Sequence, residues 1–222
     1  MSEEIEYLKK CSFWEFLTEE EKESILKNYV KKEYKAKEII YSPAKECLGV
    51  FLILEGVVRV YLMDDKGNTA TVFRMRKGDF CVLSMSCVLT EITFDVEMEA
   101  ETPCELLLIP TAVFSKISAQ NLHVENFMYK IMIDKFSHMM NAMQQLMFYS
   151  LEQRVISFLL DEAAVTGTDT LKLTKEQIAE SIGSAREAVS RVLTKLQKQQ
   201  LIVSGRKSVT ILERKKLYSY LL

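Results

Sequence analysis

Apolar and polar positions recur with two different periods along this chain. Residues 12–30 carry apolar side chains such as Phe13 and Ile25 among acids and lysines, which predicts a helix. From Glu33 to about Ile109 the pattern changes to short runs of β-branched and aromatic residues between turn residues, as in an antiparallel barrel or roll. The expected strands lie at residues 39–41, 50–54, 57–62, 70–74, 96–100 and 106–109, with a hairpin turn at 65–68.

A long helix is predicted from near Asn121 to about Met147, and it has two apolar stripes. One stripe would pack on the barrel, and the second needs another partner, most simply the same helix of a second subunit. Six of the 11 methionines fall here, which suits a contact that repacks, although they would also fill gaps in an ordinary core. The stripes are Ile133, Phe136, Met140, Met143 and Met147, and Met128, Met132, Met139, Ala142 and Leu146, the latter interrupted by Lys135. The expected dimer contacts are Met132, Phe136, Met139, Met140 and Met143.

Residues 173–203 predict two short helices joined by a tight turn. Thr174 and Gln177 are spaced as a capping box, so the first helix is expected to begin at Lys175. Gly183 supplies the turn, and Ser184 with Glu187 predicts a second capping box. A further helix is expected over 151–164, and a hairpin, or wing, over 201–212. The pattern is that of a winged helix-turn-helix, whose second helix would enter a DNA major groove.

Charge is divided along the chain in the way DNA binding would favour. The net charge of the 222 residues is -2, but residues 168–222 hold 11 Lys and Arg against 5 Asp and Glu. The expected division is a β-roll sensor over 1–110, a connecting and dimerisation helix over 111–150, and a DNA-binding domain over 151–222, giving an α+β fold. No apolar run is long enough for a membrane span, and five scattered cysteines suggest no disulfide framework, so a cytoplasmic protein is expected.

The chain resembles the Crp/Fnr family of bacterial transcription regulators over essentially its whole length. The specific match is the pattern LxLTxEQIAxxIGxxREAVSRxLxxLxxxxLI at residues 171–202. A less specific match is the spacing of Leu54-Glu55-Gly56, Asp65-x-Gly67 and Gly78-Asp79-Phe80 in the barrel. The resemblance implies a homodimer that binds a two-fold symmetric DNA site, with the effect of effector binding passed from the barrel through the long helix to the DNA-binding domains.

The resemblance also assigns roles within the second helix of the motif. It implies that Arg186, Glu187 and Arg191, with Ser190 beside them, face base edges in half-sites with a TGA-like core. Arginine suits guanine O6 and N7, and a carboxylate can accept from cytosine N4. Candidate phosphate contacts are Thr174, Lys175, Ser184, Lys195 and Lys207, which would position the protein rather than specify sequence.

The cyclic-nucleotide branch of the family carries an acid for the ribose and an Arg-Ser pair for the phosphate. Aligned on Gly78-Asp79-Phe80, the acid is replaced by Leu83, and the Arg-Ser pair by Phe94 and Asp95. A phenyl ring and a carboxylate cannot cradle a phosphodiester. We therefore expect that cAMP is not the effector, and the cofactor stays unknown.

Several other effectors remain open. Cys81 and Cys87 lie where the cyclic-nucleotide pocket would begin, so a thiol redox switch is one hypothesis, although a buried cysteine is more often inert. An iron–sulfur cluster is disfavoured because its thiolate ligands would have to come from scattered cysteines. Haem would need His123 or His138. A small apolar ligand in the barrel is at least as compatible, and a regulator without any ligand is a further alternative.

A different class of function is an alternative to a DNA-binding regulator. The barrel could serve a ligand-binding or protein-interaction module whose C-terminal domain does not bind specific DNA. An enzyme is not expected, because the chain has no phosphate-binding glycine loop, no metal-ligand spacing and no recognisable catalytic motif at its two histidines. RNA polymerase is a candidate partner, but no residue pattern identifies the surface that would touch it.

Overall fold

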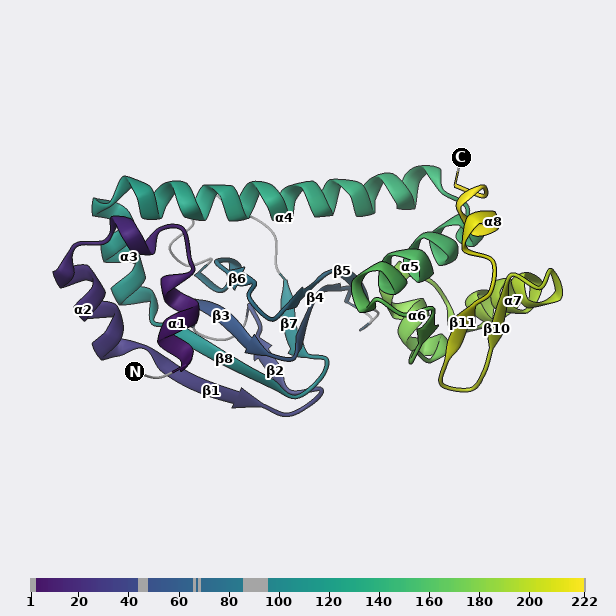
Figure 1. The fold of residues 1–222 in the computed structure, drawn as a ribbon, viewed down its shortest axis with the longest axis horizontal. Helices are drawn as coiled ribbons and strands as arrows, with labels where there is room; N and C mark the ends of the chain where they lie inside the picture. Colours follow the sequence, from purple (N-terminus) through teal and green to yellow (C-terminus); the bar gives the residue numbers. More distant parts are fainter. Residues whose placement is uncertain (1–2, 44–47, 66, 68, 86–95, 222) are drawn as a thin grey trace. The chain divides into compact units, whose positions relative to one another are not determined.

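A computed structural model describes residues 3–43, 48–65, 67, 69–85 and 96–221. The chain divides into two compact units (Figure 1). The N-terminal unit comprises residues 1–62 and 73–139, and the C-terminal unit comprises residues 63–72 and 140–222. One continuous helix, α4 (Leu122–Phe148), contributes to both.

The N-terminal unit is an antiparallel β-roll with helices packed on one of its sheets. One sheet has the strand order β1-β8-β3-β6 and the other β2-β7-β4-β5. The strands are β1 (Val30–Tyr34), β2 (Ile39–Tyr41), β3 (Val50–Glu55), β4 (Val57–Met63), β5 (Thr69–Arg76), β6 (Phe80–Cys81), β7 (Glu97–Ala100) and β8 (Cys104–Ile109). The helices are α1 (Glu3–Lys9), α2 (Glu19–Asn28), α3 (Thr111–Gln120) and the first part of α4, with short 3-10 turns at Trp14–Phe16 and Leu83–Met85.

Strand β3 reads as an unbroken apolar run because both faces of its sheet are buried. Val50 and Leu52 face a cluster formed with α1, α2, α3 and α4. Phe51 and Ile53 face the other way, into the cluster between the two sheets. The sheet is therefore a shared wall between the interior of the roll and the layer of helices.

The helix expected over residues 12–30 is corrected by the structure. A 3-10 turn spans Trp14–Phe16, Leu17 is extended, and α2 begins only after Thr18. Thr18 accepts from the backbone N–H of Glu21, and the Glu21 carboxylate accepts from the backbone N–H of Thr18. This capping box fixes the start of α2 more firmly than the apolar pattern upstream of it.

Each expected strand is present with its bounds shifted by up to a few residues, and three short strands were not expected. The polar sequence of β1 forms an edge strand, which pairs with β8. Strand β6 has only two residues, and it is defined by its pairing with Phe51 and Leu52 of β3. The third is β9 in the C-terminal unit, also of two residues.

The two apolar stripes of α4 differ in exposure. Met128 is buried, and Met132 packs against the same helix-and-sheet cluster. Met139 and Ala142 are half-buried, and Leu146, at the end of this stripe, is 56% exposed. The other stripe is exposed to solvent in the single chain, with exposed fractions of 64% for Ile133, 62% for Phe136, 47% for Met140, 52% for Met143 and 63% for Met147.

The C-terminal unit is a winged helix-turn-helix. It contains α5 (Leu151–Thr166), α6 (Lys175–Ile182), α7 (Arg186–Lys198) and α8 (Arg214–Tyr218). Strands β9 (Thr170–Leu171), β10 (Ile202–Ser204) and β11 (Val209–Ile211) form a small sheet of order β10-β11-β9. Every one of these elements contributes to one core, with α5, α6 and α7 supplying residues such as Leu159, Ile178 and Leu193. The predicted α+β fold class, a β-roll, a long helix and a winged helix-turn-helix, is confirmed.

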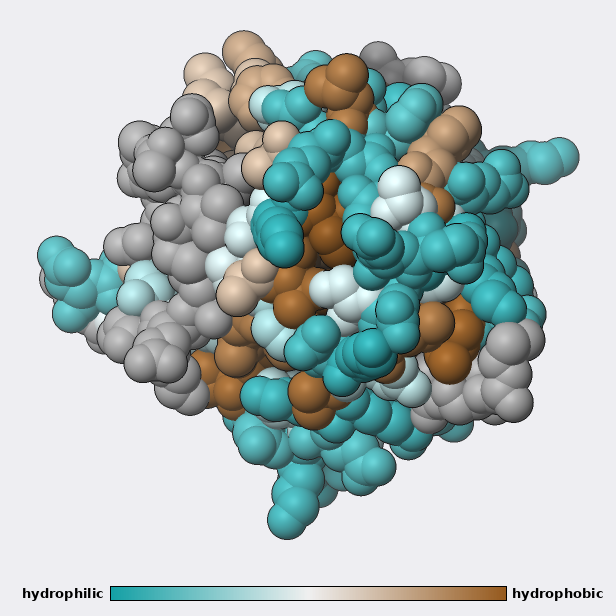
Figure 2. All heavy atoms as spheres, turned by 90° about the vertical axis from the view of Figure 1, so that its left-hand side faces the viewer, coloured by the Kyte–Doolittle hydropathy of each residue, from teal (hydrophilic) through white to brown (hydrophobic). Residues whose placement is uncertain are grey.

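Figure 2 shows a surface on which apolar side chains are interspersed with hydrophilic ones, as in other water-exposed protein surfaces. Within the described residues, no helix combines the length and apolar character needed to cross a bilayer.

Candidate DNA-binding interface

The turn between α6 and α7 is built by local backbone chemistry. Thr174 accepts from the backbone N–H of Gln177, and the Gln177 side chain accepts from the backbone N–H of Thr174, so the predicted capping box is present. Helix α6 ends at Gly183, which has φ of 60°, a left-handed conformation that glycine adopts without strain. This pair of signals sets where α6 starts and where the chain turns toward α7.

The predicted second capping box is wrong. The N-cap of α7 is Ala185, and no side chain caps the helix. The backbone N–H of Ser184 donates to the carbonyl of Ala179, which holds Ser184 within the turn that ends α6. Glu187 consequently lies in the first turn of α7 without capping it, and its carboxylate is exposed.

Helix α7 buries one face and presents a charged one. Val189, Leu193 and Leu196 are fully buried in the core of the unit. Arg186, Glu187, Ser190 and Arg191, the four predicted base contacts, together line a surface hollow of about 420 Å³. Within the described residues, no hydrogen bond or ion pair is found for the side chains of Arg186, Glu187 and Arg191. The structure therefore brings the four residues together on one face, and their contact with bases stays a prediction.

Two further side chains complete the hollow. Lys175, at the start of α6, donates from Nζ to the Ser190 hydroxyl over 3.0 Å, which ties α6 to the charged face of α7. Thr194 also lines the hollow, and its hydroxyl donates to the Ser190 carbonyl over 2.8 Å. Sequence reasoning missed Thr194, although its position four residues after Ser190 places it on the same helix face.

The remaining predicted phosphate contacts are dispersed over the unit. Lys195 Nζ lies 2.6 Å from the Glu152 carboxylate of α5, and this hydrogen bond raises the pKa of Lys195. Lys207 is exposed at the tip of the β10–β11 wing, and β10 packs beside α7 (Figure 1). Thr174 is engaged in its capping box, and Ser184 is half-buried.

The predicted effector residues are only partly described. Cys81 and Leu83 are buried in the cluster between the two sheets of the roll, whereas Cys87, Phe94 and Asp95 lie outside the described residues. Burial raises the pKa of the Cys81 thiol to about 11, which disfavours the reactive thiolate near neutral pH.

The side chains of the two histidines and of Cys11 make contacts within the N-terminal unit that need no bound metal or cofactor. His123 stacks on Phe16 with ring centroids 3.9 Å apart, and His138 lies 3.7 Å from the Asp134 carboxylate. The Cys11 thiol faces the carbonyl of Tyr7, and burial raises its pKa to about 11. Among described residues, no group of three or more His, Cys, Asp or Glu side chains could hold a metal ion.

A β-roll followed by a winged helix-turn-helix with an exposed basic recognition face defines a DNA-binding transcription regulator. Residues 153–220 match the Crp-like helix-turn-helix domain, and residues 31–121 match the cyclic nucleotide-binding domain. The solved structure of a Crp/Fnr-family transcriptional regulator from Eubacterium rectale is 35% identical, covers 94% of this chain and 97% of its own, and superposes with a TM-score of 0.88. The chain belongs to the Crp/Fnr family.

Two relatives show the range of regulators to which the chain is similar. The cAMP-activated global transcriptional regulator Vfr of Pseudomonas aeruginosa is 27% identical over 84% of this chain and 92% of Vfr. The global nitrogen regulator of Synechococcus elongatus is 27% identical over 78% of this chain and 81% of that protein.

Proposed function

We propose that this regulator acts as a homodimer on a palindromic DNA site. The observation that carries the proposal is the charged face of α7, where Arg186, Glu187 and Arg191 share one hollow with Lys175. Exposed charges without an ion-pair partner add little to the stability of the fold, but the two arginines and Glu187 match the acceptors and donors of base edges. The wing tip, with Lys207, adds a cation suited to the phosphate backbone.

The homodimer is supported by the exposed stripe of α4. Phe136, Met140 and Met143 would be buried by the same helix of a second copy, and together with Ile133 and Met147 they follow the spacing of a coiled-coil seam. Met132 and Met139, also predicted as dimer contacts, are more buried within the single chain, so the stripe centred on Met140 is the better candidate.

We further propose that an effector or redox signal at the β-roll other than cAMP sets DNA affinity. Leu83 is apolar and buried where the cyclic-nucleotide branch would carry an acid. The activation of Vfr by cAMP makes a direct test necessary, and titration of cAMP into the purified protein with calorimetric detection provides it.

The deciding experiment is selection of bound duplexes from a random pool, with and without reductant. Wild type should recover a palindrome with TGA-like half-sites centred about 10 bp apart. Arg191→Ala should lose the preference at one base pair of each half-site, a loss of about 1–3 kcal/mol of discrimination per contact.

Arg191→Lys is the matched control, because it keeps the positive charge and removes the bidentate geometry. It should retain overall affinity better than Arg191→Ala and lose the same base preference. Recovery of no sequence in either redox state, with cAMP absent or present, has two explanations: an effector missing from the assay, or a protein-interaction module without specific DNA binding. A thermal-shift screen of ligands, followed by selection with any ligand that stabilises the protein, separates the two.

A further inference from the structure

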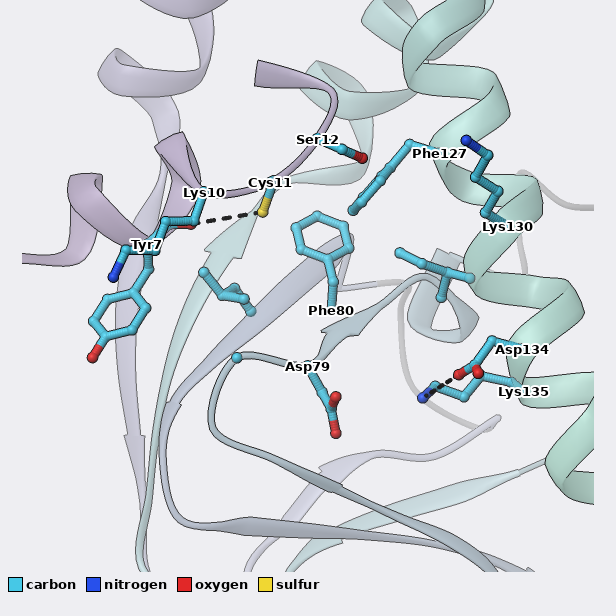
Figure 3. A pocket seen from close by; sticks show the side chains of 13 residues that line it. Tyr7, Lys10, Cys11, Ser12, Asp79, Phe80, Phe127, Lys130, Asp134 and Lys135 are labelled. Carbon is cyan, nitrogen blue, oxygen red and sulfur yellow. Dashed lines mark hydrogen bonds and ion pairs between the residues drawn. The ribbon is translucent and has the colours of Figure 1, made fainter. Parts of the chain in front are cut away.

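The N-terminal unit contains a cavity of about 590 Å³ that is separate from the interior of the roll (Figure 3). Its walls come from the end of α1 and the turn after it, from the segment Gly78–Phe80, and from one face of α4. This volume falls within the range of small-molecule sites. Cys81 and Leu83, whose side chains lie between the sheets, are not among its lining residues.

The base of the cavity is apolar and aromatic. The rings of Phe80 and Phe127 have centroids 5.3 Å apart in an edge-to-face arrangement, and both are visible in the middle of Figure 3. Leu52 and Ile131 complete this surface. The flat or branched apolar body of a ligand would lie against this surface, where Phe80 is only 6% exposed and Phe127 and Ile131 are half-buried.

Lys135 brings a positive charge to this apolar surface. It interrupts the apolar stripe of α4 that contains Met128 and Met132, and its side chain is only 14% exposed. Its ammonium lies 3.1 Å from Asp134, whose carboxylate is 57% exposed and also neighbours His138. Figure 3 shows the Lys135 side chain directed from α4 toward the cavity. The charge of a largely buried ammonium whose one anionic partner is solvent-exposed would be stabilised further by a second anion.

The other charges of the lining leave the cavity suited to an anion. Asp79 is the second acid, and its carboxylate accepts from the backbone N–H of Arg76 over 2.7 Å, so its charge is already stabilised by the turn. Lys10 and Lys130 also line the cavity, but Figure 3 shows their ammonium groups directed away from it, and Lys10 Nζ lies over the Tyr7 ring at 5.0 Å from its centroid. Lys135 is therefore the cation of the lining that faces a ligand.

We propose that this cavity binds a small organic acid, with an aromatic or branched apolar body on Phe80, Phe127 and Ile131 and a carboxylate on Lys135. Cys81 and Leu83, the described residues of the expected effector pocket, do not line it. Its ligand would contact α1, the Gly78–Phe80 segment and α4 together. The proposal concerns binding alone, so its test needs no DNA and is independent of the proposed DNA target.

The test uses 2-naphthoate and its neutral isostere 2-naphthamide as probes, with full-length protein and isothermal calorimetry. Wild type should bind the acid about tenfold or more tightly than the amide, the difference expected of a charge-assisted hydrogen bond. Lys135→Met should abolish that preference, and Lys135→Arg should retain it. Ile131→Trp, which fills the cavity, should weaken both probes.

Lys116→Met on α3, an exposed lysine outside the cavity lining, is the matched control and should bind like wild type. Thermal unfolding without probe establishes that each variant is folded. If the Lys135→Met variant is unfolded, the binding of the probes to Lys135→Arg and Ile131→Trp tests the proposal. Absence of binding, equal binding of acid and amide, or binding unaffected by Ile131→Trp would each overturn the proposal.

Discussion

Thr174 with Gln177 and Ser184 with Glu187 both have the spacing of a capping box, yet only Thr174 caps a helix. The difference arises at Gly183, whose left-handed conformation draws Ser184 into the turn that ends α6. Helix α7 then begins one residue later than the motif suggests, at Arg186. The shift leaves Glu187 with no capping role that would compete with recognition of a base.

This difference predicts unequal effects of two similar substitutions on stability. Thr174→Ala should lower the free energy of unfolding by about 1 kcal/mol, because it removes the capping hydrogen bond of α6. Ser184→Ala should change it by less than about 0.5 kcal/mol, since its hydroxyl caps nothing. Urea unfolding of both variants measures this free energy. Equal losses in the two variants would show that Ser184 caps α7 as Thr174 caps α6.

At the scale of elements, the sequence could predict those parts whose pattern is set by their own residues. Helices α4 and α6 and the wing were predicted close to their observed bounds, because periodicity, a capping box and turn residues are local signals. Strands β1, β6 and β9 were missed because they are polar or only two residues long and exist through pairing with partners distant in sequence. The cavity beside Lys135 was missed for the same reason, since its walls meet only in the folded unit.

The exposed stripe of α4 predicts where a dimer would be broken. Met140→Glu should place a charge in the proposed seam and weaken dimerisation by about 2 kcal/mol or more, a rise of roughly thirtyfold in the dissociation constant. Asn141→Glu is the matched control on the same helix, because Asn141 lies away from the stripe and is exposed. Sedimentation equilibrium measures both variants. A wild-type monomer, or equal effects of the two substitutions, would remove the dimer from the proposed function.

At the scale of the whole molecule, charge is segregated by function. Residues 168–222 carry an excess of Lys and Arg in a chain whose net charge is -2. The acidic remainder limits nonspecific attraction to nucleic acid, so binding should depend on the cations that the DNA-binding unit brings to the backbone. Among these cations, Lys195 is already paired with Glu152, whereas no ion pair of Lys207 is found among the described residues.

Affinity for the selected palindrome should therefore fall steeply with salt. If Lys175, Lys195 and Lys207 of both subunits contact phosphates, the slope of log K against log salt should be about −5. Lys207→Gln should make the slope shallower by about 2, because one contact is lost per subunit. Lys195→Gln should change the slope less, because Lys195 must break its ion pair with Glu152 before it can contact a phosphate. Fluorescence anisotropy measures each slope, at protein concentrations well above the dimer dissociation constant. A slope near zero, or a slope that Lys207→Gln leaves unchanged, would contradict phosphate contacts by the wing.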